Sequence, residues 1–310
     1  MPSKSLLPLV ALILCSCSHI GASPKGTGDH QLKVGTLTRT YSLHVPTLPS
    51  DGKPVPLVIV LHGSGDSGRG IEDMTQFSPL SDREGFIVAY PDALDENWND
   101  GREAADIDSQ FHHVDDVGFL SALIDDISKA HRIDPKRIFV TGFSNGGILA
   151  DYAGAQLADR LAAIAPVSGG IAEPFAARFK PSGPISVLII HGDSDKLVPY
   201  GGGNVDYKDN GRIIATQDTV ERWRKVCGCQ AEPAVGDLPD TDTHDHCTVK
   251  WSRWSGGRQG TEVMTFIVTG GGHGWPGGPQ FLPPSAIGYV NHDFDATAAI
   301  WEFFKKHPRA

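Results

Sequence analysis

A serine flanked by glycines stands near the middle of the chain, in the pentapeptide Gly-Phe-Ser-Asn-Gly at residues 142–146. It follows an apolar run of strand length, residues 138–141, and precedes a helix-compatible segment, residues 147–158. A strained strand-to-helix turn needs glycines to avoid side-chain collisions, and it lifts the serine oxygen clear of the sheet. The spacing alone is weak evidence in a chain with 36 glycines, but its placement predicts that Ser144 is a nucleophile.

A serine hydroxyl attacks poorly until a histidine accepts its proton and a carboxylate holds that histidine. After such a turn the partners follow in the chain order Ser, Asp, His. Residues 187–190 form a later apolar run, and Asp193 and Asp195 stand in the loop after it. Asp195 is favoured as the orienting acid because it lies further into the loop, whereas Asp193 is better placed to brace the turn.

His273 is the predicted general base. It follows the apolar run of residues 263–268 and stands among glycines in the loop of residues 270–278. Backbone rich in glycine can be shaped for one geometry, and the histidine comes in the expected order. His112 and His113 precede a predicted helix, so they are expected to cap it or to lie at the surface.

A second glycine-containing loop follows the first central strand, with the sequence Leu-His-Gly-Ser-Gly at residues 61–65. In an acyl-transfer site of this kind, such a loop donates one backbone N–H to the oxyanion, and the residue after the nucleophile donates the other. These donors are predicted at Ser64 and Asn145. His62 is expected to brace the structure, because one general base is enough.

Two tryptophans stand close to these segments. Trp98 lies in an aromatic-bearing loop, and Trp275 follows the predicted base by two residues. Either indole could wall a substrate pocket, and either could belong to the core. Both are retained as candidate substrate-binding residues.

Short apolar runs alternate with longer amphipathic stretches, which predicts an α/β fold with a mostly parallel central sheet and helices on both faces. The predicted strands are residues 57–61, 86–90, 138–141, 161–167, 187–190 and 263–268. The predicted helices are residues 117–130, 147–158, 216–226 and 295–304. Residues 32–37 and 39–44 predict an antiparallel hairpin at one sheet edge, and the polar stretches 201–211 and 231–246 predict surface excursions.

Composition limits the partners. The formal net charge is −10 over 310 residues, so there is no basic surplus for binding nucleic acid. Residues 1–23 carry a lysine, a short apolar run and then small residues, which predicts a secretory signal and a secreted or periplasmic protein. Cys17 also fits a lipoprotein signal, which would leave the mature chain lipid-anchored at the cell envelope. No later stretch is apolar enough to predict a transmembrane segment, and residues 24–310 are expected to form one domain.

Three cysteines follow the signal, at positions 227, 229 and 247. Export permits a disulfide, and an odd count leaves one thiol over. Zinc is the competing interpretation, with His244 and His246 nearby, but paired C-x-x-C spacing is missing. No metal and no cofactor are therefore expected.

Seven segments together resemble the polyhydroxybutyrate depolymerase-like esterases, which include LpqC-type lipoprotein esterases and lie close to family 1 carbohydrate and feruloyl esterases. The matching segments are LHGSGDSG from Leu61, NWNDGR from Asn97, VDDVGFL from Val114, VTGFSNGG from Val140, IIHGDSDKLVPY from Ile189, GGGHGWPGGPQFLP from Gly270 and DFDATAAIWEFF from Asp293. They span nearly all of the chain after the signal, and the GGGHGWPGG segment is the most specific of them.

This resemblance implies an α/β-hydrolase fold with Ser144, Asp195 and His273 as the catalytic triad. It also implies a disulfide between Cys229 and Cys247, with Cys227 as the odd thiol. Relatives that digest solid polyester often carry an added binding domain, and this chain ends soon after its last predicted helix.

The resulting hypothesis is a serine esterase that acts through an acyl-enzyme on hydroxyalkanoate esters or oligomers. A feruloyl or acetyl esterase acting on plant polysaccharide is the first alternative. An acyltransferase is the second, although no residue identifies its acceptor site. A binding protein on a hydrolase scaffold is the third, and an intact triad disfavours it.

Overall fold

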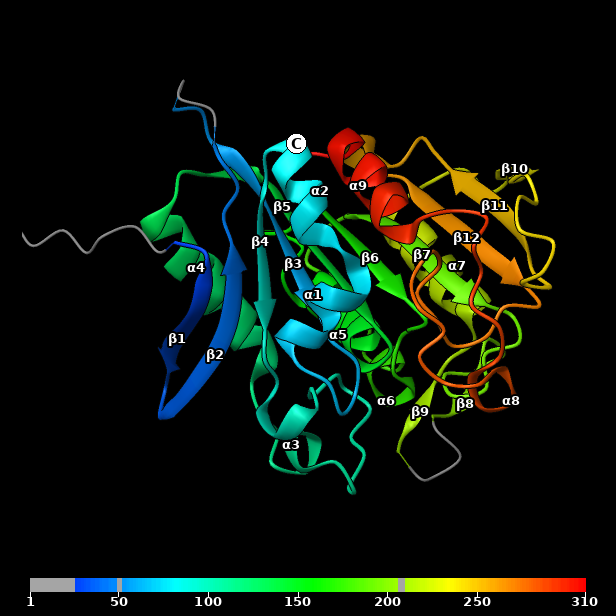
Figure 1. Ribbon diagram of the computed structural model, residues 1–310, viewed down its shortest axis with the longest axis horizontal. Coiled ribbons are helices and arrows are strands. Elements are labelled where there is room, and N and C mark those ends of the chain that lie inside the picture. The colour runs from blue at the N-terminus through cyan, green and yellow to red at the C-terminus, as the bar shows by residue number, and fades with distance from the viewer. Residues whose placement is uncertain (1–25, 49–51, 206–209) are drawn as a thin grey trace, which may run out of the picture.

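The computed structural model describes residues 26–48, 52–205 and 210–310. The predicted signal segment and Cys17 lie outside the described residues. A ten-stranded sheet runs through the molecule in the order β1-β2-β4-β3-β5-β6-β7-β12-β11-β10 (Figure 1). The strands β4, β3, β5, β6, β7 and β12 are parallel, and both edges are antiparallel.

The strands of this sheet are β1 (Gly28–Val34), β2 (Leu37–His44), β3 (Val55–Leu61), β4 (Ile87–Pro91), β5 (Ile133–Phe143), β6 (Ala163–Val167), β7 (Ser186–Gly192), β10 (Ala234–Asp237), β11 (Thr248–Trp254) and β12 (Val263–Thr269). A separate small pair consists of β8 (Gly203–Asn204) and β9 (Arg212–Ile213). The helices are α1 (Gly68–Thr75), α2 (Phe77–Glu84), α3 (Asp108–Phe111), α4 (Asp116–Ala130), α5 (Asn145–Gln156), α6 (Glu173–Ala176), α7 (Thr216–Cys227), α8 (Pro284–Ile287) and α9 (Ala296–Lys306).

The sheet separates two apolar cores. Successive side chains of a strand point to opposite faces, and β3 is buried at every position. Its odd-numbered residues Leu57, Ile59 and Leu61 pack with α4, α5 and α7. Its even-numbered residues Val58 and Val60 pack with α1, α2 and α9, the three helices in front of the sheet in Figure 1. Central parallel strands are near-continuously apolar because both faces are covered.

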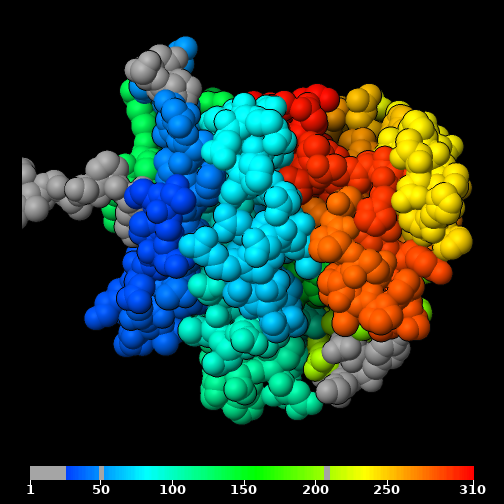
Figure 2. All heavy atoms as spheres, viewed as in Figure 1, coloured from blue at the N-terminus to red at the C-terminus, as the bar shows by residue number. Residues whose placement is uncertain are grey.

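The carboxyl ends of the parallel strands meet at one edge of the sheet, at the bottom of Figure 1. The loops after β3, β5, β7 and β12 therefore gather there, together with the short helices α3, α6 and α8. In open α/β sheets, ligands bind outside this edge of the strands. The space-filling view shows the orange segment that follows β12 packed beside the cyan helices α1 and α2 (Figure 2).

Most predicted elements are confirmed, including the edge hairpin, which is β1 and β2 joined at Gly35. The prediction that residues 231–246 form only a surface excursion is wrong in part, because Ala234–Asp237 forms the edge strand β10. The strand β11 and the helices α1 and α2 were not predicted. Within the described chain, no helix combines the length and the apolar character needed to cross a membrane.

Candidate active site

Ser144 occupies a sharp turn between β5 and α5. Its backbone has φ 57° and ψ −120°, a conformation that costs a non-glycine residue free energy and that clusters at functional sites. The flanking glycines permit it, since a Cβ atom on Gly142 would lie 2.4 Å from the Gly146 carbonyl oxygen. A Cβ atom on Gly146 would lie 2.4 Å from the Leu61 carbonyl oxygen. The turn is therefore compatible only with glycine at both positions.

His273 and Asp195 form a buried pair across the ends of β12 and β7. The Nδ1 atom of His273 lies 2.8 Å from Oδ2 of Asp195. The other carboxylate oxygen, Oδ1, accepts hydrogen bonds from the main-chain N–H groups of Leu197 and Val198, both at 2.9 Å. With Nδ1 donating to the carboxylate, Nε2 of His273 is the nitrogen that can accept a proton.

The carboxylate of Asp195 remains charged despite its burial. Burial by itself raises the pKa of a carboxyl group. The His273 ring, hydrogen-bonded to the carboxylate, and the neighbouring His191 ring together outweigh burial, so the pKa of Asp195 lies below its ordinary value. A charged carboxylate at this position can orient a histidine and stabilise its protonated form.

Asp193 has a different position, as the sequence predicts. Its Oδ1 accepts a hydrogen bond from the main-chain N–H of Gly270 at 2.8 Å, and its side chain is exposed. Asp193 therefore ties the loop after β7 to the loop that carries His273, and it does not contact the histidine ring in the described structure.

Ser144 and His273 line the same cavity, which has a volume of about 720 Å³. Gly63 and Ser64 line it too, and a Cβ atom on Gly63 would lie 3.4 Å from Cβ of Ser144. The loop after β3 thus comes close to the serine. The predicted nucleophile, base and Ser64 donor share one hollow, with Asp195 buried behind it.

Asn145 directs its side chain into the protein. Its Nδ2 donates to Oδ2 of Asp100 at 2.6 Å, and its Oδ1 accepts from the main-chain N–H of Trp98 at 2.8 Å. The side chain therefore anchors the loop after β4 beneath the turn. The oxyanion role predicted for Asn145 involves its main-chain N–H and leaves these side-chain bonds intact.

His62 braces the loop that carries Ser64. Its Nε2 accepts a hydrogen bond from the main-chain N–H of Ala93 at 3.0 Å, and its Nδ1 lies 2.7 Å from the Gly63 carbonyl oxygen. Burial lowers the pKa of His62, so the neutral ring with its hydrogen on Nδ1 fits both contacts.

The structure corrects the expectation that Trp98 and Trp275 wall the substrate pocket. Their side chains are 0% and 2% exposed, and neither lines the cavity in the described structure. The indole of Trp98 donates to the His62 carbonyl oxygen, and that of Trp275 donates to Oγ1 of Thr297. A buried tryptophan satisfies its N–H inside the core, and both residues do so here.

Phe143, Phe281 and Leu282 provide the apolar wall instead. The rings of Phe143 and Phe281 lie edge to face, with their centroids 6.0 Å apart. Phe143 also packs 4.7 Å from the His273 ring. Phe281 and Leu282 belong to the same esterase-like segment as His273. The available sequence signal for a pocket wall was this pair of apolar residues shortly after the predicted base.

A buried ion pair below the turn was not predicted from the sequence. Asp100 and Arg102 are joined at 2.8 Å and have almost no exposed side-chain surface. Burial raises the pKa of Asp100, although the charge of Arg102 and hydrogen bonds from Arg102 and Asn145 oppose that rise. The available sequence signal was the segment of residues 97–102, which contains three carboxyl or amide residues and an arginine.

The expected disulfide between Cys229 and Cys247 is wrong. Cys227, Cys229 and Cys247 are free thiols. Cys229 lies in the core with α4, α5 and α7, whereas Cys247 lies in the core with α1, α2 and α9, so the sheet separates them. Across residues 26–48, 52–205 and 210–310, no cluster of His, Cys, Asp and Glu side chains could hold a metal ion.

The parallel sheet with a serine on a strained turn, and with a histidine and a carboxylate on later loops, defines an α/β hydrolase. The family described as phospholipase/carboxylesterase matches residues 45–210. The chain belongs to this family and is a carboxylic ester hydrolase.

Named relatives agree with this class. The putative esterase NocK of Nocardia uniformis subsp. tsuyamanensis is 30% identical over 89% of this chain and 82% of its own length. Feruloyl esterase B of Piromyces equi is 30% identical over 75% of this chain, which spans only 43% of that relative. Poly(3-hydroxyalkanoate) depolymerase C of Paucimonas lemoignei is 26% identical, with coverages of 76% and 58%. The solved acetyl xylan esterase of Aspergillus awamori shares the fold, with TM-score 0.57, 18% identity and coverages of 80% and 94%.

Proposed function

We propose that this chain is a serine esterase in which Ser144, His273 and Asp195 act as a catalytic triad. The observation that carries the proposal is the strained turn of Ser144, which opens into the same cavity as His273 while Asp195 holds Nδ1 of that ring. The hydroxyl of a serine in such a turn is exposed to substrate, and the free Nε2 is the atom that can take its proton.

The reaction has two steps. Ser144 Oγ attacks the ester carbonyl carbon, and His273 Nε2 takes the hydroxyl proton and returns it to the departing alkoxide, which leaves as the alcohol. The main-chain N–H groups of Ser64 and Asn145 stabilise the negative oxygen. Water then attacks the acyl-enzyme with His273 as base, which releases the acid and restores Ser144.

The substrate proposed first is an ester of an aromatic acid of the feruloyl type. The edge-to-face pair of Phe143 and Phe281 stands beside the predicted base in the cavity, and such rings favour a flat aromatic acyl group. Feruloyl esterase B as a relative supports this choice. A hydroxyalkanoate ester is the second candidate, supported by the poly(3-hydroxyalkanoate) depolymerase relative.

Two experiments test these proposals in sequence. A fluorophosphonate probe should label the purified protein at Ser144, as peptide mass spectrometry would show, and absence of labelling in folded protein would refute the serine mechanism. Release of ferulate from methyl ferulate should then exceed release of 3-hydroxybutyrate from short oligomers at equal active-site concentration. The reverse order would replace the first substrate with the second.

We also propose that residues 1–23 direct export and that residues 24–310 form one catalytic domain. The lysine, apolar run and small residues of the first segment support export. A sheet with strands from Gly28–Val34 to Val263–Thr269 supports one domain. Mass spectrometry of the mature amino terminus should show either cleavage near residue 23 or a lipid-modified Cys17, and an intact residue 1 would refute export by this segment.

A further inference from the structure

A second buried histidine approaches the same carboxylate oxygen as His273. His191 is a residue of β7 and has no exposed side-chain surface. Its Nε2 lies 3.5 Å from Oδ2 of Asp195, the oxygen that lies 2.8 Å from Nδ1 of His273. Two imidazole rings therefore approach one oxygen of the predicted triad acid.

His191 also holds the loop that surrounds Asp195. Its Nε2 lies 2.8 Å from the carbonyl oxygen of Val198, and the main-chain N–H of Val198 donates to Oδ1 of Asp195. The histidine thus contacts the carboxylate directly and also fixes a residue that holds the other carboxylate oxygen.

The surrounding atoms define the protonation of His191. The carbonyl oxygen of Val198 and the carboxylate of Asp195 can only accept, so Nε2 carries a hydrogen. The Nδ1 atom lies 2.8 Å from Oγ1 of Thr216, a hydroxyl that can donate. A neutral ring satisfies both contacts, and Thr216, the first residue of α7, fixes the orientation of the ring.

Other titratable groups face this ring from the packed elements. Tyr200, in the loop after β7, places its ring edge to face at 5.8 Å. Asp151 of α5 is buried and accepts from the indole N–H of Trp223 at 2.7 Å. The Oδ2 atom of Asp151 has no hydrogen-bond partner among the described residues. Burial raises the pKa of Asp151 to about 7, against the opposing effects of the hydrogen bond from Trp223 and of the His191 ring.

We propose that His191 is a positioning residue for ester hydrolysis. Its Nε2–H donates to the Val198 carbonyl and lies beside the Asp195 carboxylate, and so keeps the Val198 loop and Asp195 in the geometry that orients His273. Thr216 supports this role by holding Nδ1. The inference rests on the function proposed above, in which His273 is the general base. A misoriented base slows proton transfer from the serine but leaves substrate binding in the cavity unchanged.

The test compares His191→Met, which removes the donor, with His191→Gln, whose amide nitrogen can replace Nε2. Turnover of p-nitrophenyl butyrate is divided by the concentration of sites that a fluorophosphonate probe labels at its endpoint, so misfolded protein does not count. His191→Met should lower kcat about tenfold, since the hydrogen bond to the Val198 carbonyl and the N–H beside the Asp195 carboxylate are both lost, with KM within about twofold. His191→Gln should recover most of this loss.

Thr216→Val and Thr216→Ser form a second, milder pair that keeps the histidine. The valine variant should lower kcat about threefold, the effect of one neutral hydrogen bond, and the serine variant should match the wild type. Wild-type kcat per labelled site in His191→Met, or equal losses in His191→Met and His191→Gln, would overturn the positioning role. Failure of the wild-type protein to react with the probe would instead refute the serine mechanism, so the two failures are distinguishable.

Discussion

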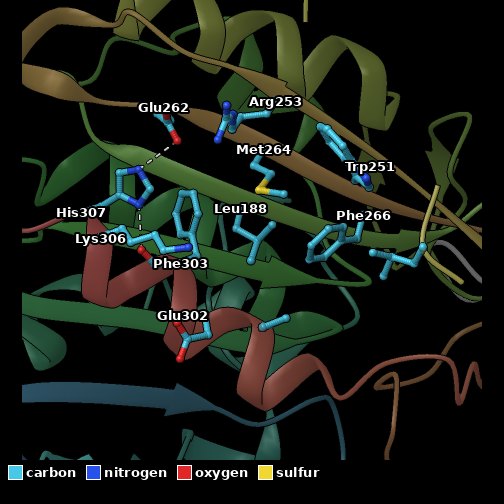
Figure 3. Close-up of a pocket in the computed structure, with 12 residues that line it drawn as sticks. Leu188, Trp251, Arg253, Glu262, Met264, Phe266, Glu302, Phe303, Lys306 and His307 are labelled. Carbon is cyan, nitrogen blue, oxygen red and sulfur yellow. Dashed lines mark hydrogen bonds and ion pairs between the residues drawn. The ribbon is translucent and has the colours of Figure 1, made fainter. Parts of the chain in front are cut away.

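Two hollows of this molecule differ in volume and in how each one uses its histidine. The proposed reactive cleft is the cavity of about 720 Å³ that Ser144 and His273 line, formed by loops at the carboxyl ends of the parallel strands. A second hollow, of about 350 Å³, lies between β12, β11 and α9. Figure 3 shows its apolar walls, which include Leu188, Trp251, Met264, Phe266 and Phe303.

Each hollow contains a histidine, and the two histidines have different freedom. The Nδ1–H of His273 donates to Asp195, which leaves Nε2 available for the proton transfer proposed above. His307 places Nδ1 2.7 Å from the Phe303 carbonyl oxygen and Nε2 3.2 Å from a carboxylate oxygen of Glu262, the two dashed contacts in Figure 3. Both nitrogens of His307 are used in holding the end of α9. An apolar hollow therefore does not by itself indicate a reactive site. The proposal of an active site rests on a histidine with one free ring nitrogen and a serine on a strained turn in the same cavity.

The largest effect should come from the nucleophile. Ser144→Ala should lower kcat for p-nitrophenyl butyrate about a millionfold, because the proposed acyl-enzyme forms on this hydroxyl. Ser252→Ala in β11 is the matched control and should retain wild-type turnover. Near-normal turnover in Ser144→Ala would show that ester hydrolysis does not use this serine.

The next effect distinguishes the two neighbouring carboxylates. Asp195→Asn should lower kcat about ten-thousandfold, since an amide in place of the carboxylate favours the wrong histidine tautomer. Asp193→Asn keeps an oxygen for the N–H of Gly270 and should stay within about threefold of wild type. Steady-state kinetics at pH 7 measure both, and a larger loss in Asp193→Asn would assign the orienting role to that residue.

The Asp195 carboxylate predicts that the free energy of unfolding depends on pH. Because the pKa of Asp195 is below its ordinary value, its charge stabilises the fold above the unfolded-state pKa of about 3.9. That contribution is lost as the pH falls through the folded-state pKa. The difference in free energy of unfolding between wild type and Asp195→Asn, from urea titrations, should therefore shrink as the pH is lowered below about 4. A constant difference would mean that Asp195 has an ordinary pKa.

A smaller effect should distinguish acyl groups in the reactive cleft. Phe281→Ala should lower kcat/KM for methyl ferulate about tenfold, as expected for the loss of apolar and aromatic contact. Its effect on a p-nitrophenyl acetate control should be less than about threefold, because acetate does not reach the ring. Phe111→Ala removes another exposed ring, 60% exposed and outside the cleft, and should alter neither substrate. Equal losses on both substrates would exclude Phe281 from acyl selection.

A substitution in the second hollow should affect stability and leave turnover unchanged. Phe303→Ala should lower the free energy of unfolding by about 3 kcal/mol, as for other buried aromatic side chains. The kcat per probe-labelled site should match wild type, because Phe303 lines the hollow beside α9 and not the cavity that Ser144 and His273 line. A lower kcat per site would show that the two hollows are coupled.

The local sequence predicted the central strands and the four helices α4, α5, α7 and α9. Strands buried on both faces are short apolar runs, and helices buried on one face repeat their apolar residues with the helical period. The helices α1 and α2 were not predicted, because each has only eight residues and a largely polar composition. The strand β11 has the polar–apolar alternation of a half-buried strand. It was not predicted because it follows directly on a polar, turn-rich stretch, and its pairing with β12 identifies it.

By itself, the sequence determined the serine turn and the order of the later carboxylate and histidine loops. Gly142 and Gly146 allow the backbone to make the tight turn at Ser144. The apolar runs predict where the preceding strands end. Only the tertiary structure decided that Phe281 faces the cleft while Trp98 faces the core. It also decided that Cys229 and Cys247 lie on opposite sides of the sheet. These outcomes depend on contacts between segments distant in the chain, and neither local propensity nor residue spacing contains that information.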